Sequence, residues 1–333
     1  MEEKKLMSLN FKSRNNWFLE NLIYNRAFSL TLLIIFISII MSVFYGQSFL
    51  SGRNFAALLL SLASTGFLSI GMMLLLISGS FDLSVGANLA LGGIMTVYLM
   101  SKFTAMPIPL AMIIGVALST FFGFLNGIVV AKIKVNALIA TFAMGGIIRA
   151  IATYFSGAGI VALPPEYLAF GQTVFLGVQM PVYYMIALVI IFSFLTSRIR
   201  YFRQLYFIGG NEKAAELSGI NVTKVRMISF VIMGALAGFA GVVQTARLNV
   251  ALGTLATGIE LPVITAVILG GGSIAGGRGT IAGAFTGALF IAIIQNAMVI
   301  GGINVYFQGV VIGAILIAAV GTDLAILRKL GSR

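Results

Sequence analysis

Long apolar runs separated by short polar segments make up most of this 333-residue chain. A membrane-spanning helix needs about 20 predominantly apolar residues, and most of these runs reach or approach that length. Charged residues are only 9% of the chain, whereas a soluble domain carries about 25%. The sequence therefore predicts an all-α, polytopic integral membrane protein.

About ten transmembrane helices are predicted. They lie at about 28–45, 55–78, 85–101, 108–131, 137–155, 182–196, 227–245, 261–270, 281–300 and 305–320. The eighth is short for a full crossing, and residues 79–86 interrupt an apolar region. Broken or re-entrant segments of this kind are tolerated only where protein buries them or where they line a cavity. The predicted organisation is an N-terminal tail at 1–27, a transmembrane domain at 28–321 and a C-terminal tail at 322–333.

Basic residues are distributed unevenly between the two sides of this layout. Seventeen Lys and Arg residues fall in the tails and in the segments between spans on one side, and three, Arg53, Lys102 and Arg247, fall on the other. Cytoplasmic loops carry the excess of positive charge, so both termini and the loop 198–226 are predicted to be cytoplasmic. The net charge of +12 thus marks topology and not nucleic-acid binding.

Several kinds of chemistry are excluded by composition. The chain has no cysteine and no histidine, which removes disulfides, thiol nucleophiles, histidine acid–base catalysis and the usual zinc sites. No GxxxxGK[ST] segment occurs, so the chain has no P-loop of its own. The N-terminus does not have the pattern of a signal peptide. We expect no metal, no bound cofactor and no catalytic residue.

The loop 198–226 is a polar island with six basic residues between apolar runs. Within it, residues 209–220 predict a short helix with Asn211 as N-cap, Glu212 in the first turn and Gly219 as the stop. The simple interpretation is a solvated loop. The alternative is a rigid docking helix whose displacement by a partner protein moves the adjoining spans.

Three glycines, Gly279, Gly283 and Gly287, recur at intervals of four residues. On a helix they would form one smooth face that another backbone can approach closely. Ordinary helix packing explains this pattern, and sliding of the faces during transport is the functional alternative.

A few polar side chains interrupt the apolar runs and are candidates for a translocation path, because ionisable groups at membrane depth often mark function. Four of them have a structural alternative. Asp82 can cap a helix, Arg149 can pair with carbonyl groups or reach the outer surface, and Gln295 and Asn296 can join helices or bind a polyol. The candidates are Asp82, Ser84, Asn88, Asn126, Arg149, Gln295 and Asn296.

Three segments together resemble a known family. Residues 79–86, GSFDLSVG, resemble its GGIDLSVG; residues 209–220, GGNEKAAELSGI, resemble its GxNxxAAxLSGI; residues 264–279 resemble its AAVxLGGxSxxGGxG. The family is the membrane-spanning permease subunits of ribose-type bacterial ATP-binding-cassette sugar importers. The similarity covers about residues 50–320, with small departures at Ser80 and Gly272.

The resemblance implies a multi-pass protein of the bacterial inner membrane, surrounded by membrane lipid, that works with partners. Two permease subunits, identical or related, would form the path. A separate ATPase subunit would bind ATP, and an extracytoplasmic sugar-binding protein would deliver a ribose-like monosaccharide or a furanose signal of the autoinducer-2 type. The residues expected to couple to the ATPase are Gly210, Asn211, Glu212, Lys213, Ala214, Ala215, Glu216 and Gly219.

Other classes of function fit the residues less well. An ion-coupled secondary transporter would need intramembrane carboxylates in a relay, and an enzyme would need paired catalytic groups. A passive channel would leave the capped cytoplasmic helix without a role. Dependence on ATP separates the importer from all three.

Overall fold

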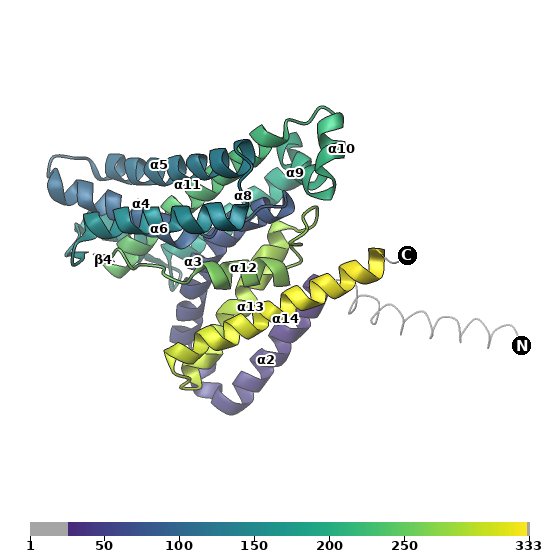
Figure 1. Cartoon of the computed structure of the whole chain (residues 1–333). Coiled ribbons are helices and arrows are strands. Elements are labelled where there is room, and N and C mark those ends of the chain that lie inside the picture. Colours follow the sequence, from purple (N-terminus) through teal and green to yellow (C-terminus); the bar gives the residue numbers. More distant parts are fainter. Residues whose placement is uncertain (1–25, 332–333) are drawn as a thin grey trace, which may run out of the picture.

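The computed structural model describes residues 26–331, so the first 25 residues of the predicted N-terminal tail (1–27) lie outside the described residues. Within these residues the structure is predominantly helical, with four very short strands (Figure 1). The elements are α2 (Arg26–Phe49), α3 (Gly52–Ile77), α4 (Val85–Lys102), α5 (Ile108–Gly127), η1 (Ile128–Lys132), α6 (Ala137–Ser156), β1 (Ile160–Val161), α7 (Pro165–Gln172), β2 (Val174–Phe175), β3 (Val178–Gln179), α8 (Met180–Arg198), α9 (Arg200–Gly210), α10 (Glu212–Leu217), α11 (Val222–Leu248), β4 (Val250–Ala251), α12 (Glu260–Leu269), α13 (Ile281–Ile300) and α14 (Val305–Gly331).

The ten predicted spans correspond to ten helices of the described chain. Seven are long and apolar enough to cross a membrane, and α4, α12 and the apolar part of α14 supply the other three. The prediction of a short eighth span is confirmed: α12 has ten residues, which at 1.5 Å per residue cover about half of a 30 Å hydrocarbon core. Because α14 continues to Gly331, the helix extends past the predicted end of the last span.

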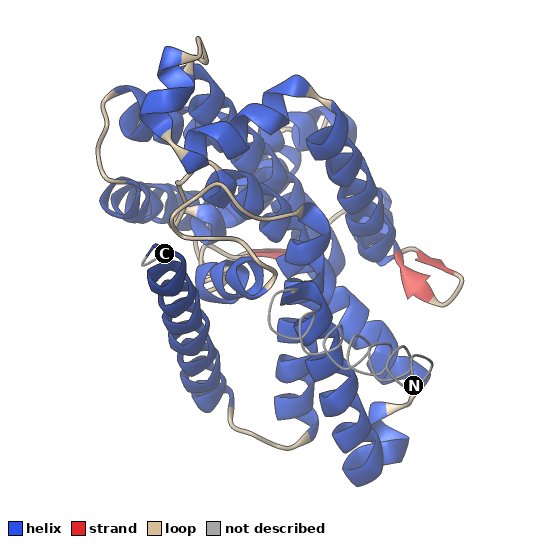
Figure 2. Ribbon diagram, turned by 90° about the vertical axis from the view of Figure 1, so that its right-hand side faces the viewer, coloured by secondary structure: helices blue, strands red, loops and turns tan. Residues whose placement is uncertain are grey.

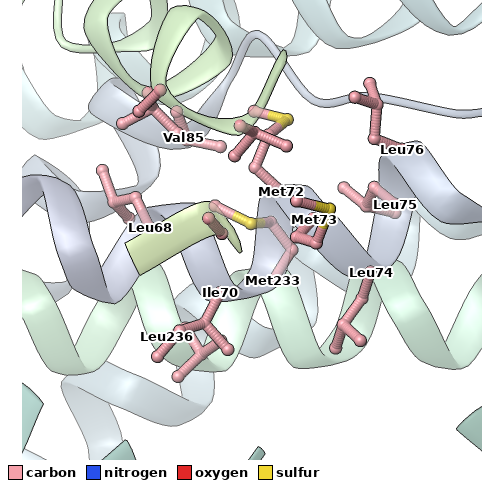
Figure 3. Packing of buried hydrophobic residues seen from close by; sticks show 14 of the residues in the cluster. Leu68, Ile70, Met72, Met73, Leu74, Leu75, Leu76, Val85, Met233 and Leu236 are labelled. Carbon is pink, nitrogen blue, oxygen red and sulfur yellow. The ribbon is translucent and has the colours of Figure 1, made fainter. Parts of the chain in front are cut away.

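Helix α3 lies at the centre of the bundle. Every residue from Gly66 to Ile77 is buried, and Leu68, Met72 and Leu75 have no exposed surface. Figure 3 shows these side chains packed against Met233 and Leu236 of α11. A helix that is apolar on every side can be surrounded by protein or by lipid, and the burial of α3 shows that here the other helices pack around it.

Small residues bring α11 close to α4 and α5. A Cβ atom on Gly234 would lie 3.0 Å from Gly123 Cα of α5, and one on Gly238 would lie 2.7 Å from Ser119 Cβ. Gly241 packs in the same way on the α4 backbone at Leu89 and Gly93. Membrane helices associate through such close backbone approach, because lipid supplies no hydrophobic driving force between them.

The predicted glycine face is only partly correct. Helix α13 begins at Ile281, so Gly279 precedes the helix, with a φ of +141° that favours glycine. Gly283 and Gly287 do lie on α13, where added Cβ atoms would collide with the carbonyl oxygens of Gly270 and Ala266. The prediction is therefore wrong for Gly279 and holds for the other two, which pack α13 against α12.

The two ends of the bundle differ in structure. Helices α9 and α10 lie at one end, and the start of α2 and the end of α14 lie on that side too (Figure 1). At the opposite end are α7, the pair β1–β4 and the small hairpin β2–β3, which is seen at the edge of the helical body in Figure 2. We call these the α10 end and the far end; by its basic residues the α10 end is the predicted cytoplasmic side.

Candidate coupling and translocation sites

Helix α10 forms as its sequence predicts. The backbone N–H of Ala214 donates to Asn211 Oδ1 over 3.0 Å, which caps the first turn. Gly219 follows the helix with a φ of +80°, and the N–H of Ile220 donates to the Ala215 carbonyl over 3.1 Å. Among the predicted coupling residues, only Ala215 is buried; its side chain faces the bundle, whereas Gly210, Lys213, Ala214 and Glu216 are exposed.

The tip of α10 carries an apolar residue that points away from the protein. Leu217 is 91% exposed, although it lies on a polar loop at the predicted cytoplasmic surface. An exposed apolar side chain on a short, capped helix suits contact with another protein.

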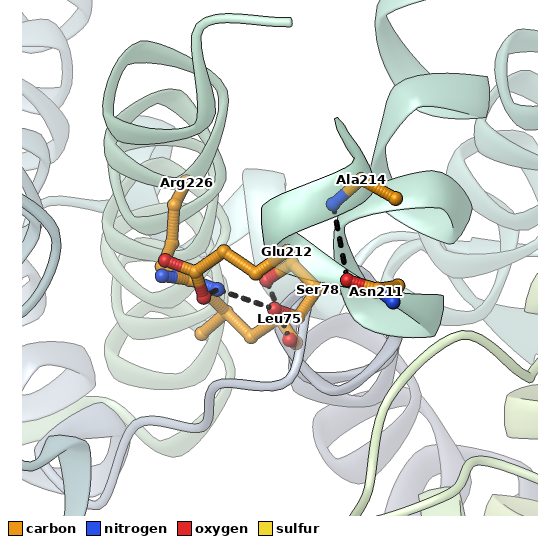
Figure 4. A network of polar contacts seen from close by, with 6 residues as sticks. All are labelled: Leu75, Ser78, Asn211, Glu212, Ala214 and Arg226. Atoms are coloured by element: carbon orange, nitrogen blue, oxygen red, sulfur yellow. Dashed lines mark hydrogen bonds and ion pairs between the residues drawn. The ribbon is translucent and has the colours of Figure 1, made fainter. Parts of the chain in front are cut away.

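An ion pair connects α10 to α11 and α3 (Figure 4). The Arg226 guanidinium donates to Glu212 Oε2 over 2.9 Å and to the Ser78 carbonyl over 3.1 Å. The Arg226 side chain is 13% exposed and that of Glu212 is 41% exposed. The hydrogen bond from Arg226 lowers the pKa of Glu212 below its usual 4.5, against the opposing effect of its partial burial.

Glycines bring three distant segments together beneath this ion pair. Gly209 at the end of α9 packs directly on the carbonyl of Ile77 and the backbone N of Gly277, so that a Cβ there would collide with both. Gly276 packs on Gly209 in turn, and a Cβ on Gly276 would lie 3.1 Å from Gly79 N. The Gly277 N–H donates to the Ile77 carbonyl over 2.9 Å. The three sequence motifs therefore meet at one place, which we call the glycine junction (residues 77–79, 209–210 and 276–277).

Four of the predicted path residues, Asp82, Ser84, Asn88 and Asn126, are fully buried between α4 and α5. Asp82 Oδ1 accepts from the Ser84 N–H over 2.8 Å and from the Ser84 hydroxyl over 2.6 Å, and Asn126 Nδ2 donates to Ser84 Oγ over 2.9 Å. Asn88 Nδ2 donates to the Ser119 carbonyl over 3.0 Å. In this conformation these buried groups join the start of α4 to α5. The structural alternative for Asp82 was a helix cap; Asp82 does accept a backbone N–H, that of Ser84, but α4 itself has no side-chain cap hydrogen bond.

Arg149 pairs with carbonyl groups, the first of the alternatives for this residue. Its Nη1 donates to the carbonyls of Gly253 and Leu255 over 2.6 and 2.8 Å. It also lines a pocket of about 500 Å³ between α6 and the start of α12, together with Glu260. The arginine thus fixes the segment between β4 and α12, where Ala256 adopts a left-handed φ of +57°.

A second pocket, of about 450 Å³, lies on the other side of that segment, and both pockets include Thr257 and Gly258. Its lining is largely uncharged and polar, with Arg247 as the one cation, and it contains Gln295 from the predicted path set. Gln244 Nε2 hydrogen-bonds the Ser64 hydroxyl and Gln244 Oε1 accepts from Arg247 Nε over 3.1 Å. Asn296, the neighbour of Gln295, faces away and exchanges two hydrogen bonds with Asn54 of α3, at 2.6 and 3.2 Å.

Sequence reasoning missed the residues that complete this second pocket. Ser64 and Gln244 are polar residues within apolar spans. The same pattern singled out Gln295, so it could also have identified these two residues. The pairing of Arg226 with Glu212 had no such signal, because it depends on how α11 lies against α10.

The comparisons with known proteins agree with this architecture. Residues 54–320 match the family described as branched-chain amino acid transport system / permease component. The chain is 35% identical to the ribose import permease protein of Bacillus subtilis, over 87% of this chain and 90% of that protein. It is 32% identical to the L-arabinose ABC transporter permease protein of Azospirillum brasilense, over 91% and 88%, and 35% identical to the D-allose transport system permease protein of Escherichia coli, over 86% and 89%.

No solved structure matches the chain. The family match covers most of the chain, and the relatives align along nearly their whole length, so the similarity is not confined to the three motifs. The chain thus belongs to the permease-component family of ATP-binding-cassette importers, as a multi-pass protein of the bacterial inner membrane that has no ATPase site of its own.

Proposed function

We propose that this chain is the permease subunit of an importer for a monosaccharide, driven by a separate ATPase subunit that docks on α10. The observation that carries the proposal is α10 itself: a capped helix with exposed Leu217 at its tip, joined to the ends of α3 and α11 by Arg226. The relatives named for ribose, arabinose and allose transport support the sugar class.

The glycine junction gives the docking helix a mechanical connection to the spans. Backbone in direct contact cannot yield as a flexible side chain can, because packed protein interiors have little free volume. A shift of α10 therefore moves the ends of α3 and α9 and the loop before α13 together. ATP binding to the partner subunits would change the populations of outward-facing and inward-facing states through this connection.

The polar pocket between α3, α11, α12 and α13 fits a stage in the passage of a sugar. Hydroxyl and amide side chains such as Ser64, Gln244 and Gln295 exchange donors and acceptors with a polyol. A lining of this kind, with Arg247 as its single charge, offers a sugar mainly neutral hydrogen bonds, and conduction requires a site that the solute can also leave. Selection would then take place at an extracytoplasmic binding protein, and a furanose signal would pass by the same mechanism.

The proposal is tested at Leu217. We expect Leu217→Asp to abolish recovery of a Walker-motif ATPase with the purified chain and to abolish ATP-dependent sugar uptake. Leu176→Asp is the matched control, because Leu176 is 82% exposed on the hairpin at the far end. ATPase recovery that is equal for both variants would remove the docking role. Uptake that persists without ATP and collapses with an ion gradient would replace the proposal with a secondary transporter.

A further inference from the structure

A groove at the α10 end of the bundle has no part in the proposed sugar route. It has a volume of about 430 Å³ and lies along the contact between α5, η1 and α11. Its lining combines apolar residues with two lysines and two small polar residues: Phe124, Lys132, Asn221, Thr223, Lys224, Met227, Ile228 and Val231.

The two lysines make one end of the groove positive. Lys132 ends η1, Lys224 lies in the first turn of α11, and both side chains are exposed. Within residues 26–331 neither lysine forms an ion pair; the nearby acid, Glu212, is paired with Arg226. The positive end of the α11 helix dipole adds to the same field, although Asn221 Oδ1 already accepts the Lys224 N–H over 2.9 Å. This end of the groove therefore fits an anion.

The remainder of the groove is apolar and faces outward. Phe124 is 40% exposed, and Met227, Ile228 and Val231 are half-buried, at increasing distance along α11 from Lys224. Phe124 and these α11 residues lie on helices that are long and apolar enough to cross a membrane, so acyl chains can reach this surface. The basic end lies where the spans meet the polar loops.

We propose that this groove is a binding site for an anionic phospholipid of the inner leaflet, with its phosphate between Lys132 and Lys224 and an acyl chain along Met227 and Val231. The arrangement of charge and apolar surface supports a lipid and not a free anion, because a soluble phosphate would leave the apolar length of the groove without a partner. It supports an anionic lipid because two unpaired cations stand at the headgroup level.

The site is placed to influence coupling. Lys224 and Arg226 belong to the same first turns of α11, and Arg226 holds α10 and the end of α3. Lys132 is the last residue of η1, a π-helical turn, and such distortions are often found at functional sites. A lipid bound here stabilises one position of the α11 N-terminus against the glycine junction.

The test is lipid binding to the purified full chain in neutral detergent, measured by native mass spectrometry. Phosphatidylglycerol and phosphatidylcholine with the same acyl chains are compared, and glycerol phosphate is added as the headgroup alone. We expect the double variant Lys132→Gln, Lys224→Gln to weaken phosphatidylglycerol binding about thirtyfold. Each lysine near an anionic surface contributes about 1 kcal/mol, and about 1.4 kcal/mol corresponds to a tenfold change in affinity. The control is Arg200→Gln with Arg203→Gln, an equal loss of exposed charge on α9 at the same end, which should change binding less than about threefold.

A second variant tests the apolar part. Val231→Trp fills the groove and should displace the lipid while leaving both lysines in place. Equal binding of the two lipids, or equal loss in the α9 control, would overturn the proposal. If glycerol phosphate at the same concentration displaces the lipid equally well, the groove binds an anion and not a lipid, and the proposal is overturned. Binding needs neither ATP nor sugar, so the result does not depend on the proposed function.

Discussion

The two ends of the bundle are built from different parts of the chain. At the α10 end, the glycine junction places backbone directly on backbone, at Gly209, Gly277 and Ile77. At the far end, two pockets of about 450 and 500 Å³ are lined by side chains such as those of Arg149 and Gln295. Backbone contacts transmit displacement, whereas pockets lined by side chains can admit a solute and change its contacts. In the proposed function, force would enter the subunit at the α10 end and solute at the far end.

The largest expected effect comes from adding a single methyl group at the glycine junction. We expect Gly209→Ala to destabilise the protein by about 3 kcal/mol or more, because its Cβ would meet the Ile77 carbonyl and the Gly277 backbone, neither of which can move without the helices. Thermal unfolding of the purified chain, followed by its aggregation or by near-ultraviolet circular dichroism, measures the loss.

The neighbouring glycine supplies the control for that substitution. A Cβ on Gly210 has no heavy atom within 4 Å, so Gly210→Ala should leave the unfolding temperature almost unchanged. Equal effects of the two substitutions would show that helix propensity, and not the close backbone contact, determines stability here.

At the far end, the largest expected effect comes from Arg149. Arg149→Met removes a charged donor from the carbonyls of Gly253 and Leu255, and a hydrogen bond to a charged group contributes about 1.5–3 kcal/mol. We expect a loss of about 2 kcal/mol, together with faster proteolysis or hydrogen exchange of residues 252–258. Arg53→Met, near the start of α3, is a control for loss of positive charge at that end; a similar loss there would contradict the specific role of Arg149.

Much of the fold was predictable from the sequence. Hydropathy located ten helices, because an apolar run of sufficient length has one stable structure in lipid, and the short α12 was evident from its length. Capping chemistry located α10, since Asn211 and Gly219 act on their own turns. These features depend on residues that are near one another in the chain.

The site was less predictable, because it depends on contacts between distant segments. The motifs around Gly79, Gly209 and Gly276 were each recognisable, yet nothing in their spacing indicates that they touch. Asp82 was a candidate for the path because a buried charge in a membrane is unusual, and the structure explains it through Ser84 and Asn126, the second of which is more than forty residues away. Gly279 was placed on a helix that begins two residues later.

A smaller loss of stability is expected where α7 packs against α11 at the far end. The Tyr167 hydroxyl of α7 donates to the Val242 carbonyl over 2.9 Å and contacts Thr245 Oγ1 at 2.5 Å. Tyr167→Phe keeps the ring, which is fully buried, and removes the hydroxyl with both of its hydrogen bonds, so we expect a loss of about 1–2 kcal/mol. Unfolding temperature measures this, with Tyr154→Phe on exposed Tyr154 as the control. If Tyr167→Phe loses more stability than Arg149→Met, the hydroxyl of Tyr167 and not the guanidinium of Arg149 contributes more to the stability of the far end.

The smallest expected effect is the pH dependence of the ion pair at the α10 end. Arg226 lowers the pKa of Glu212 in the folded protein below 4.5, the value taken for the unfolded chain, so the folded form binds this proton less readily. The resulting stabilisation is complete above pH 4.5 and is lost as the pH falls through the folded-state pKa. Since Glu212 is 41% exposed, solvent screening limits the contribution to about 1 kcal/mol or less. Unfolding temperatures between pH 5 and pH 3 should therefore fall slightly more for the unmodified protein than for Glu212→Gln. If the two curves are parallel, the ion pair adds no stability, and the glycine junction and the packing of buried Ala215 join α10 to the spans.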